Sequence, residues 1–370
     1  MAVQPKTASS SRSLAQDRIG RLRLGFSALK ADALLVTHLP NIRYLCGFTG
    51  SAGLLLVDSA RATLFTDSRY TFQAREEVAG ARIQIASGGL LAAAGKALKR
   101  HRRLALAYAP SQLTVAQLDA LHTAIGKRIR WVKAPDLVEQ LRAVKDKVEL
   151  AAIRDAAILI SNVFRQMVPK IRPGISELDL SADIEYAMKR EGALGPSFET
   201  IVAAGPRSAW AHARPSSKPL AKNELVVLDQ GAILRGYCSD MTRTVFLGRP
   251  SEKVRDMYSA VLEAQAAAKL AIRPGATAGD VDASARKVLK ARSLARYFTH
   301  STGHGLGIEV HEIPRLGRGD KTVLQQGMVL TVEPGVYLEG LGGVRIEDDV
   351  VVTSNGAVDL TTAPRELLEL

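Results

Sequence analysis

The chain has 370 residues, of which 46% are hydrophobic and 24% charged, as in ordinary globular proteins. No apolar run approaches the roughly 20 residues that a membrane span requires, and the polar N-terminus has no hydrophobic stretch typical of a secretory signal. We therefore expect no membrane partner. The only cysteines, Cys46 and Cys238, are far apart in the sequence, which indicates no disulfide framework and favours a reducing, cytoplasmic location.

The net charge of +13 is unevenly distributed along the chain. Residues 1–150 contain 23 Lys and Arg against 11 Asp and Glu, whereas residues 151–370 contain 27 against 26. A basic half can attract nucleic acid or an anionic surface. No aromatic-rich RNA-binding signature, zinc finger or helix-turn-helix pattern accompanies the charge. We therefore favour a solvated or subunit-contacting surface, expect no nucleic-acid partner, and place a domain boundary near this change.

Helices and strands alternate in the first half, which predicts an α/β domain over residues 13–140. Residues 1–12 are expected to form an unstructured lead-in, and apolar positions at helical spacing predict a helix over 14–30. The buried strand predicted over 31–39 is followed by a turn at Pro40-Asn41. Further strands are predicted within 47–58, 62–70 and 103–109, and helices over 71–80 and 113–125.

A second domain, over residues 144–370, combines helices and strands in longer blocks and is predicted to be α+β. A long helix over 144–168 is closed by Pro169, and another helix begins at a Ser176 cap. Strands are expected at 198–205, in ELVVLDQGA and GYCSDMTRTVFLG, and at 328–337 and 342–353; helices are expected at about 251–271 and 278–292.

The second domain repeats itself. The turn and helix start at Arg172-Pro173-Gly174 are echoed at Arg273-Pro274-Gly275, an offset of 101. HARP is echoed by HEIP, and VVLDQGA by LTVEPGV, at offsets of 99 and 104. Three echoes in the same order indicate two similar halves related by a pseudo-twofold axis, with a shared site between them.

Acidic and imidazole side chains in the C-terminal third occur at intervals that suit a metal site. Four carboxylates and one imidazole form an oxygen-rich ligand set, which suits manganese, cobalt or ferrous iron better than a structural zinc. Four carboxylates are too much charge for one divalent ion, so a pair of ions is expected, and such a pair can ionise a water between them. The five candidate ligands are Asp229 in VVLDQGA, Asp240 in YCSDMTRT, His304 in STGHGLG, Glu333 in LTVEPGVY and Glu347 in GGVRIEDD.

Two of these residues have plainer interpretations. Asp240 could be a turn aspartate exposed to water, and Glu347, which alternates with Arg345, could form a surface salt bridge. Asp229 and Glu333 follow apolar runs, where a buried unpaired carboxylate would be costly, so they fit a structural role poorly.

Three of the seven histidines fall between residues 300 and 311. His304 is the best ligand because the glycines on both sides let the backbone approach a bound group closely. His212, His300 and His311 are expected to bind substrate or to stabilise charge. No G-x-S-x-G elbow is present and neither cysteine has a histidine within a few residues, so covalent catalysis is disfavoured.

Taken together, VLDQGA, YCSDMTRT, FTHSTGHGLGIEVHEIP, LTVEPGVY and GGVRIEDD resemble the metal-dependent pita-bread peptidases that cleave bonds before proline, aminopeptidase P and the Xaa-Pro dipeptidases (prolidases). The resemblance extends from about residue 31 to the C-terminus. It includes YLCGFTGSAG and LFTDSRYTFQA, which are similar to the N-terminal domain shared with creatinase. It thus implies a creatinase-like N-terminal domain followed by a pita-bread catalytic domain.

The resemblance implies roles for individual residues. The five candidate ligands match the family's metal-ligand positions, the three histidines match residues that contact the substrate or the tetrahedral intermediate, and Arg345 matches an arginine near the ligands. It also implies two divalent ions, with manganese expected and cobalt or zinc as alternatives, and a homodimer that acts on proline-containing peptides. One departure is Ala211, which precedes His212 where relatives often carry proline.

The mechanism implied is hydrolysis, in which the metals lower the pKa of a bridging water towards ~7. Glu333 would pass its proton to the leaving nitrogen, and His311 or His212 would stabilise the oxyanion. GFTGSAG favours an aminopeptidase, with an Xaa-Pro dipeptidase as the alternative. Methionine aminopeptidase is disfavoured by the N-terminal domain, and a metal-free creatinase by the complete ligand set. A non-catalytic scaffold or nucleic-acid binder is a more remote alternative.

Overall fold

The computed structural model describes residues 8–100, 103–126 and 129–370. It divides into two compact units, Met1–Arg142 and Ala143–Leu370, and each is described by itself. Among the described residues, no helix is both long enough and apolar enough to cross a bilayer.

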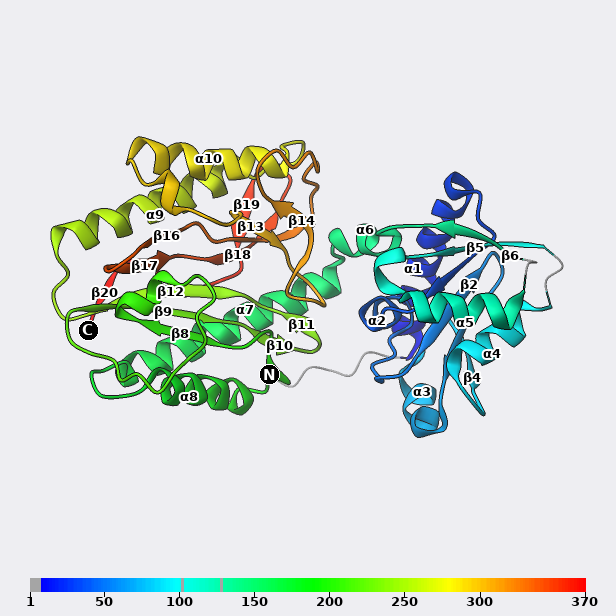
Figure 1. Cartoon of the computed structure of the whole chain (residues 1–370). Helices are drawn as coiled ribbons and strands as arrows, with labels where there is room; N and C mark the ends of the chain where they lie inside the picture. Colours follow the sequence, from blue (N-terminus) through cyan, green and yellow to red (C-terminus); the bar gives the residue numbers. More distant parts are fainter. Residues whose placement is uncertain (1–7, 101–102, 127–128) are drawn as a thin grey trace. The chain divides into compact units, whose positions relative to one another are not determined.

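A six-stranded mixed sheet forms the centre of the N-terminal unit (Figure 1). Its strands are β1 (Ala33–Val36), β2 (Leu54–Asp58), β3 (Ala62–Thr66), β4 (Arg82–Ile85), β5 (Leu104–Tyr108) and β6 (Ile129–Lys133). The order is β4-β3-β2-β1-β5-β6. β2 runs antiparallel to β1 and β3, and the other pairs are parallel. All four residues of β1 are buried, as expected of a strand covered on both faces.

Helices cover this sheet. They are α1 (Ala8–Leu29), α2 (Leu39–Cys46), α3 (Thr71–Glu77), α4 (Leu90–Leu98), α5 (Val115–Ile125) and α6 (Leu137–Ala143). Leu98 of α4 and Leu121 of α5 share one buried cluster with Leu35 and Leu106 of the central strands. The predicted α/β class is therefore confirmed.

The structure corrects two sequence-based expectations. Residues 8–12, expected in an unstructured lead-in, belong to α1, while residues 1–7 lie outside the described residues. The turn expected at Pro40-Asn41 is the start of α2 instead. Proline is tolerated in the first turn of a helix because its missing N–H would have no intrahelical partner there. Burial of Ile42 and Leu45 stabilises this short helix.

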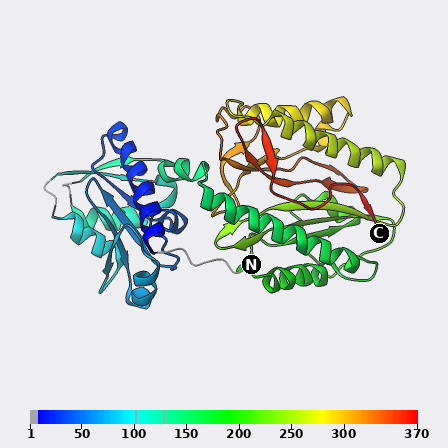
Figure 2. The same ribbon diagram turned by 180° about the vertical axis from the view of Figure 1, so that it is seen from behind.

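The C-terminal unit consists of curved sheets between two pairs of helices. α7 (Lys147–Met167) and α8 (Glu177–Arg190) lie on one outer side, and α9 (Glu252–Ala271) and α10 (Ala278–Ala291) on the other (Figures 1 and 2). The strands are β7 (Gly195–Pro196), β8 (Ile201–Ala204), β9 (Glu224–Gln230), β10 (Ala232–Leu234), β11 (Tyr237–Cys238), β12 (Met241–Leu247), β13 (Gly303–Gly305), β14 (Glu312–Leu316), β15 (Val329–Val332), β16 (Gly335–Leu338), β17 (Gly342–Arg345), β18 (Asp348–Val352), β19 (Ala357–Asp359) and β20 (Leu368–Glu369). The two larger sheets have the orders β20-β12-β9-β8 and β14-β13-β15-β18-β19.

The two halves of this unit follow one local plan. Helices α8 and α10 are both 14 residues long, and the hydroxyls of Ser176 and Thr277 cap them by accepting the backbone N–H three residues on. Each cap residue also forms an antiparallel bridge to the segment before the middle strand of its half, Ser176 with Pro219 before β9 and Thr277 with Val323 before β15. In each half, an antiparallel three-strand ladder follows, β8-β9-β12 in the first and β13-β15-β18 in the second. The predicted internal repeat is confirmed.

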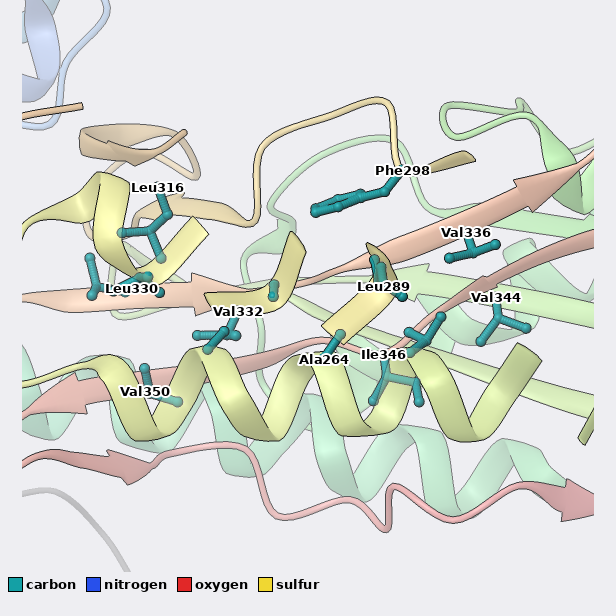
Figure 3. Packing of buried hydrophobic residues seen from close by; sticks show 14 of the residues in the cluster. Ala264, Leu289, Phe298, Leu316, Leu330, Val332, Val336, Val344, Ile346 and Val350 are labelled. Atoms are coloured by element: carbon teal, nitrogen blue, oxygen red, sulfur yellow. The ribbon is translucent and has the colours of Figure 1, made fainter. Parts of the chain in front are cut away.

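The larger core of the unit lies under α9 and α10. Figure 3 shows Val332, Ile346 and Val350 from the strands against the helix that carries Ala264, with Leu289 of α10 beside them. All five belong to one buried cluster. The core therefore anchors the strands whose ends carry the candidate ligands.

The strands expected at 328–337 and 342–353 are each broken in two. The first ends at Val332 and resumes at Gly335, and the second ends at Arg345 and resumes at Asp348. Glu333 and Glu347 lie in these two breaks, so their side chains leave the regular alternation of the sheet.

A buried arginine fastens the second break. Arg243 of β12 is 1% exposed and donates to Glu347 O at 2.6 Å and Asp348 Oδ1 at 2.8 Å. Burial opposes the charge on Asp348, but Arg243, Arg365 and Lys269 outweigh it and hold the pKa of that carboxyl at about 2. The break is therefore held by ionic contacts from three directions.

We expect Arg243→Met to lower the free energy of unfolding of the C-terminal unit by about 3 kcal/mol, because it leaves buried acceptors and part of a buried ion pair uncompensated. Urea unfolding followed by Trp210 fluorescence in a Trp131→Phe background isolates this unit, since the chain has two tryptophans. Arg255→Met is the control, because the Arg255–Glu369 pair is solvent-exposed and its loss should hardly move the urea midpoint. Equal midpoints for the two variants would contradict the role given to Arg243.

Candidate metal centre

The candidate ligands come from both halves of the repeat. Figure 1 shows the green strands β9 and β12 of the first half near the orange and red strands β13 and β18 of the second. Backbone contact joins the halves directly, because Glu347 N donates to Thr242 O at 3.1 Å. The ligands are positioned as follows: Asp229 in β9, Asp240 just before β12, His304 in β13, Glu333 just after β15 and Glu347 between β17 and β18.

The structure brings these side chains together. One potential ligand atom from each of Asp240, His304 and Glu347 lies within 4.8 Å of the other two. His304 Nε2 is 3.6 Å from Asp240 Oδ2 and 3.5 Å from Glu333 Oε1. The charge of Asp229 acts on Asp240, Glu333 and Glu347. All five residues therefore belong to one cluster.

His304 presents a lone pair to this cluster. Its Nδ1 lies 2.9 Å from Gly305 O, a contact in which the ring nitrogen must be the donor. Nε2 is then the unprotonated nitrogen, and it faces the carboxylates. Burial lowers the pKa of His304 to about 4, so the ring is neutral near pH 7, as a metal ligand must be.

The carboxylates repel one another in a dry environment. Burial raises the pKa of Asp240 and Glu347 well above the usual range, and neighbouring carboxylates raise it further. Three buried oxygens, Asp229 Oδ1, Asp240 Oδ1 and Glu347 Oε1, have no hydrogen-bond partner among the described residues. A divalent cation would satisfy such oxygens and remove the repulsion. The residues present therefore fit divalent metal ions.

Arg345 is the cation that lies within the cluster. It is 3% exposed, and its Nη2 donates to Asp229 Oδ2 at 2.6 Å. Its Nε donates to Thr242 Oγ1 at 3.0 Å, and Nη1 donates to the Tyr337 hydroxyl at 2.7 Å. One guanidinium cannot balance four carboxylates. It instead fixes one oxygen of Asp229 and leaves the other oxygen for a cation.

The three further histidines lie around this cluster in different ways. The rings of His311 and His304 are 4.4 Å apart, and His311 is exposed on its other side. His300 has a partner at each nitrogen, the Tyr337 hydroxyl at 2.8 Å and Ser301 O at 2.8 Å. His212 is exposed on a loop, near enough for its charge to act on both His300 and His311. Their contact with substrate stays a prediction.

Sequence reasoning missed the residues that orient the ligands. Thr242 Oγ1 donates to Glu347 Oε2 at 2.6 Å, and Asp349 Oδ2 accepts from Asp240 N at 3.0 Å. Thr331 Oγ1 accepts from His304 N at 3.1 Å. A signal was present in the two-residue period of a strand, which puts Thr242 on the face of Asp240.

Comparison with known proteins agrees with this geometry. Residues 151–354 match the metallopeptidase family M24, and residues 18–144 match the creatinase/prolidase N-terminal domain. The chain belongs to metallopeptidase family M24. It is therefore a hydrolase with the pita-bread fold, and the family implies divalent metal ions.

Relatives share nearly the whole chain. A solved structure described as Xaa-Pro dipeptidase from Bacillus anthracis is 40% identical with a TM-score of 0.93, over 96% of this chain and 100% of that one. The Xaa-Pro dipeptidase of Pyrococcus horikoshii is 37% identical over 91% of this chain and 94% of that protein. An X-Pro aminopeptidase structure from Thermotoga maritima is 35% identical with a TM-score of 0.86, over 94% and 100%. The resemblance deduced from the motifs is confirmed.

We expect Thr242→Val to weaken binding of Mn²⁺ about 10- to 100-fold, because Glu347 loses its donor and Arg345 loses an acceptor while the side-chain shape is kept. Isothermal titration of the metal-depleted chain with Mn²⁺ measures this. Thr200→Val is a matched control, since Thr200 is also buried and its hydroxyl has no partner among the described residues. Unchanged affinity in the Thr242 variant would refute the orienting role.

Proposed function

We propose that this chain is a metal-dependent peptidase that hydrolyses the bond before proline, with Xaa-Pro dipeptides as its substrates. The observation that carries the proposal is the cluster of four carboxylates and one neutral imidazole. Three buried oxygens of this cluster have no hydrogen-bond partner among the described residues, and a cation could bind them. Relatives that share this fold are named Xaa-Pro dipeptidase, which supports the bond before proline as the one that is cleaved.

The five residues of the cluster would hold two divalent ions. Manganese is the ion we expect, with cobalt or zinc as alternatives, because oxygen ligands outnumber nitrogen in this set. Bound there, the ions would supply Lewis acidity, which lowers the pKa of a water towards ~7 and polarises the scissile carbonyl. Arg345 would hold Asp229 in the orientation of a ligand through their hydrogen bond.

Glu333 would move the proton. Burial raises its pKa to about 7 in the metal-free chain, although Arg345 opposes this shift. With cations bound, the carboxylate would be ionised and could accept a proton from a water beside it. Its Oε1 lies 3.5 Å from His304 Nε2, within the ligand cluster. It would take a proton from the attacking water and deliver it to the proline nitrogen as the bond breaks.

The histidines at the edge of the cluster would stabilise the negative charge that develops on the carbonyl oxygen of the scissile bond. His311 lies against His304 with its other side exposed, so a peptide could reach it. His311 or His212 would donate to the carbonyl oxygen as it becomes negative. His300 would act through Tyr337, whose hydroxyl it contacts and which Arg345 also binds.

Proline specificity follows from the chemistry of the bond. The nitrogen of the scissile bond belongs to the proline ring and carries no hydrogen, so a site built to accept a hydrogen bond from an amide N–H there would reject this substrate. An aminopeptidase acting on longer Xaa-Pro peptides is the second candidate. GFTGSAG at 47–53 and the similarity to the Thermotoga maritima enzyme favour it.

Assembly and location remain predictions. Family resemblance implies a homodimer, which light scattering after size-exclusion chromatography would test. A cytoplasmic location rests on the cysteines: Cys46 and Cys238 are free and buried, and burial raises the pKa of each thiol to about 12. Such thiols are protonated and unreactive at neutral pH.

Hydrolysis of Ala-Pro and Ala-Pro-Ala by the Mn²⁺-loaded chain tests the proposal. We expect chelator-sensitive cleavage of Ala-Pro and little cleavage of the tripeptide. Cleavage of the tripeptide at least as fast as the dipeptide would make the chain an aminopeptidase. If neither peptide were cleaved in a chelator-sensitive way, the proposal would be wrong and the scaffold alternative would gain support.

We expect Glu333→Gln to lower kcat for Ala-Pro by at least about 100-fold, because the amide cannot carry the proton. The fold should be kept, as judged by circular dichroism. Glu339→Gln, an exposed glutamate after β16, is the control and should leave kcat unchanged. Wild-type turnover by the Glu333 variant would exclude it as the proton carrier.

A further inference from the structure

A large polar cavity lies in the N-terminal unit, and none of its lining residues belongs to the metal centre. Its volume is about 790 Å³. The walls come from α1, the β2–β3 turn, the C-terminal end of α3 and the segment that leads into β4. The volume falls in the range of small-molecule sites, roughly 300–1,000 Å³.

Arginines dominate the lining of this cavity. α1 contributes two, with Gln16 and Ile19 between them on the same helix face, and the other elements contribute one each. The five are Arg12, Arg23, Arg61, Arg75 and Arg82. They account for a substantial part of the positive charge of the first 150 residues, which hydrolysis before proline does not use.

Few hydrogen-bond or charged partners compensate these guanidinium groups. Among the described residues, Arg23 is the one of the five with a side-chain hydrogen bond, from its Nε to Asp58 O at 2.8 Å, and that partner is an uncharged carbonyl. Some exposed arginines of the C-terminal unit, by contrast, are paired with carboxylates, as in Arg255–Glu369 and Arg292–Glu263. The cavity arginines are therefore available to a ligand.

Two carboxylates in the wall do not neutralise the arginines. Glu77 is already engaged, since it accepts from Thr49 N at 2.8 Å, from Thr49 Oγ1 at 2.6 Å and from Gln73 Nε2 at 3.0 Å. Glu76 is exposed at the rim. Five guanidinium groups against two carboxylates leave an excess of three positive charges.

The backbone is shaped to keep this cavity against α1. Gly80 has φ +71°, and a Cβ there would lie 3.0 Å from Ala15 Cβ. Glycine therefore lets the segment after α3 pack closely on the helix and close one side of the cavity. The wall is therefore part of the folded unit, and four of the five arginines that line it, Arg12, Arg61, Arg75 and Arg82, are exposed to solvent.

We propose that this cavity binds a small polyanion that carries two or more phosphate groups. Guanidinium groups match phosphate oxygens with two parallel hydrogen bonds each, and they cannot be neutralised by losing a proton. A diphosphate placed among them would meet several arginines at once. Nucleic acid is disfavoured because none of the described residues that line the cavity is aromatic, so a base would have no ring on which to stack.

Titration of the full-length, Mn²⁺-loaded chain with pyrophosphate, without free metal, tests this proposal. We expect saturable binding of one pyrophosphate per chain. Arg61→Glu with Arg75→Glu should weaken it at least about tenfold, since both residues are exposed and unpaired among the described residues and serve no structural contact. The matched control is Arg21→Glu with Arg103→Glu, which makes the same change in net charge at exposed positions outside the cavity and should bind like the wild type.

Several outcomes would overturn the proposal. Absence of saturable binding, or an equal loss in both double variants, would reduce the arginines to a general surface charge. Binding that is kept in the cavity variant but lost with Asp229→Asn would place pyrophosphate at the metal centre. Tighter binding of a single-stranded oligonucleotide than of pyrophosphate or ATP, lost in the cavity variant, would assign the arginines to nucleic acid. Hydrolysis of Ala-Pro should be unaffected by the cavity substitutions.

Discussion

Four carboxylates confined in a largely dry space are the constraint on which the C-terminal unit depends. Burial disfavours the charged forms of Asp240, Glu333 and Glu347, and neighbouring carboxylates raise these three pKa values further, as Glu347 does for Asp240. A protein can relieve this by protonation, by fixed cations or by bound ones. Arg345 is the fixed cation, and its contact with Asp229 satisfies one oxygen only. The neutral His304 adds no charge. The rest of the relief comes from protonation or from bound cations.

The fold supplies this cluster by interrupting its strands. Pro334 cannot donate to a ladder, and β15 ends at Val332, so Glu333 lies in the break between β15 and β16. The matching break before Asp348 is held by Arg243 from the other half of the repeat. Close packing brings the imidazole in, because a Cβ at Gly303 would lie 2.0 Å from Thr331 O. Buried strands thus place polar side chains in the metal centre, while the apolar core beneath them stays covered.

Local signals in the sequence predicted much of this. The Ser176 and Thr277 caps, the repeat offsets and the five acidic and imidazole positions were all readable, because each depends on neighbouring residues or on short strings. The orienting contacts were not readable. Thr242 and Glu347 are 105 residues apart, and Arg345 and Asp229 are 116 apart, so only the folded chain pairs them. The helix at Pro40 was missed because its stability comes from burial of its apolar side chains, which outweighs the turn signal of Pro-Asn.

Each unit gathers charges of one sign, carboxylates in the metal centre and arginines in the cavity of the N-terminal unit, and the two kinds of charge are compensated differently. In the metal centre, burial raises carboxyl pKa values towards the range in which protons and metal ions compete, so occupancy by a cation should depend on pH. In the arginine cavity no such competition exists, because a guanidinium stays charged at any pH that the fold tolerates. Only solvent, salt or an anionic ligand can compensate it. Where the phosphate groups of the ligand keep the same charge, binding in the cavity should therefore respond to ionic strength far more than to pH, whereas the metal centre should show the reverse.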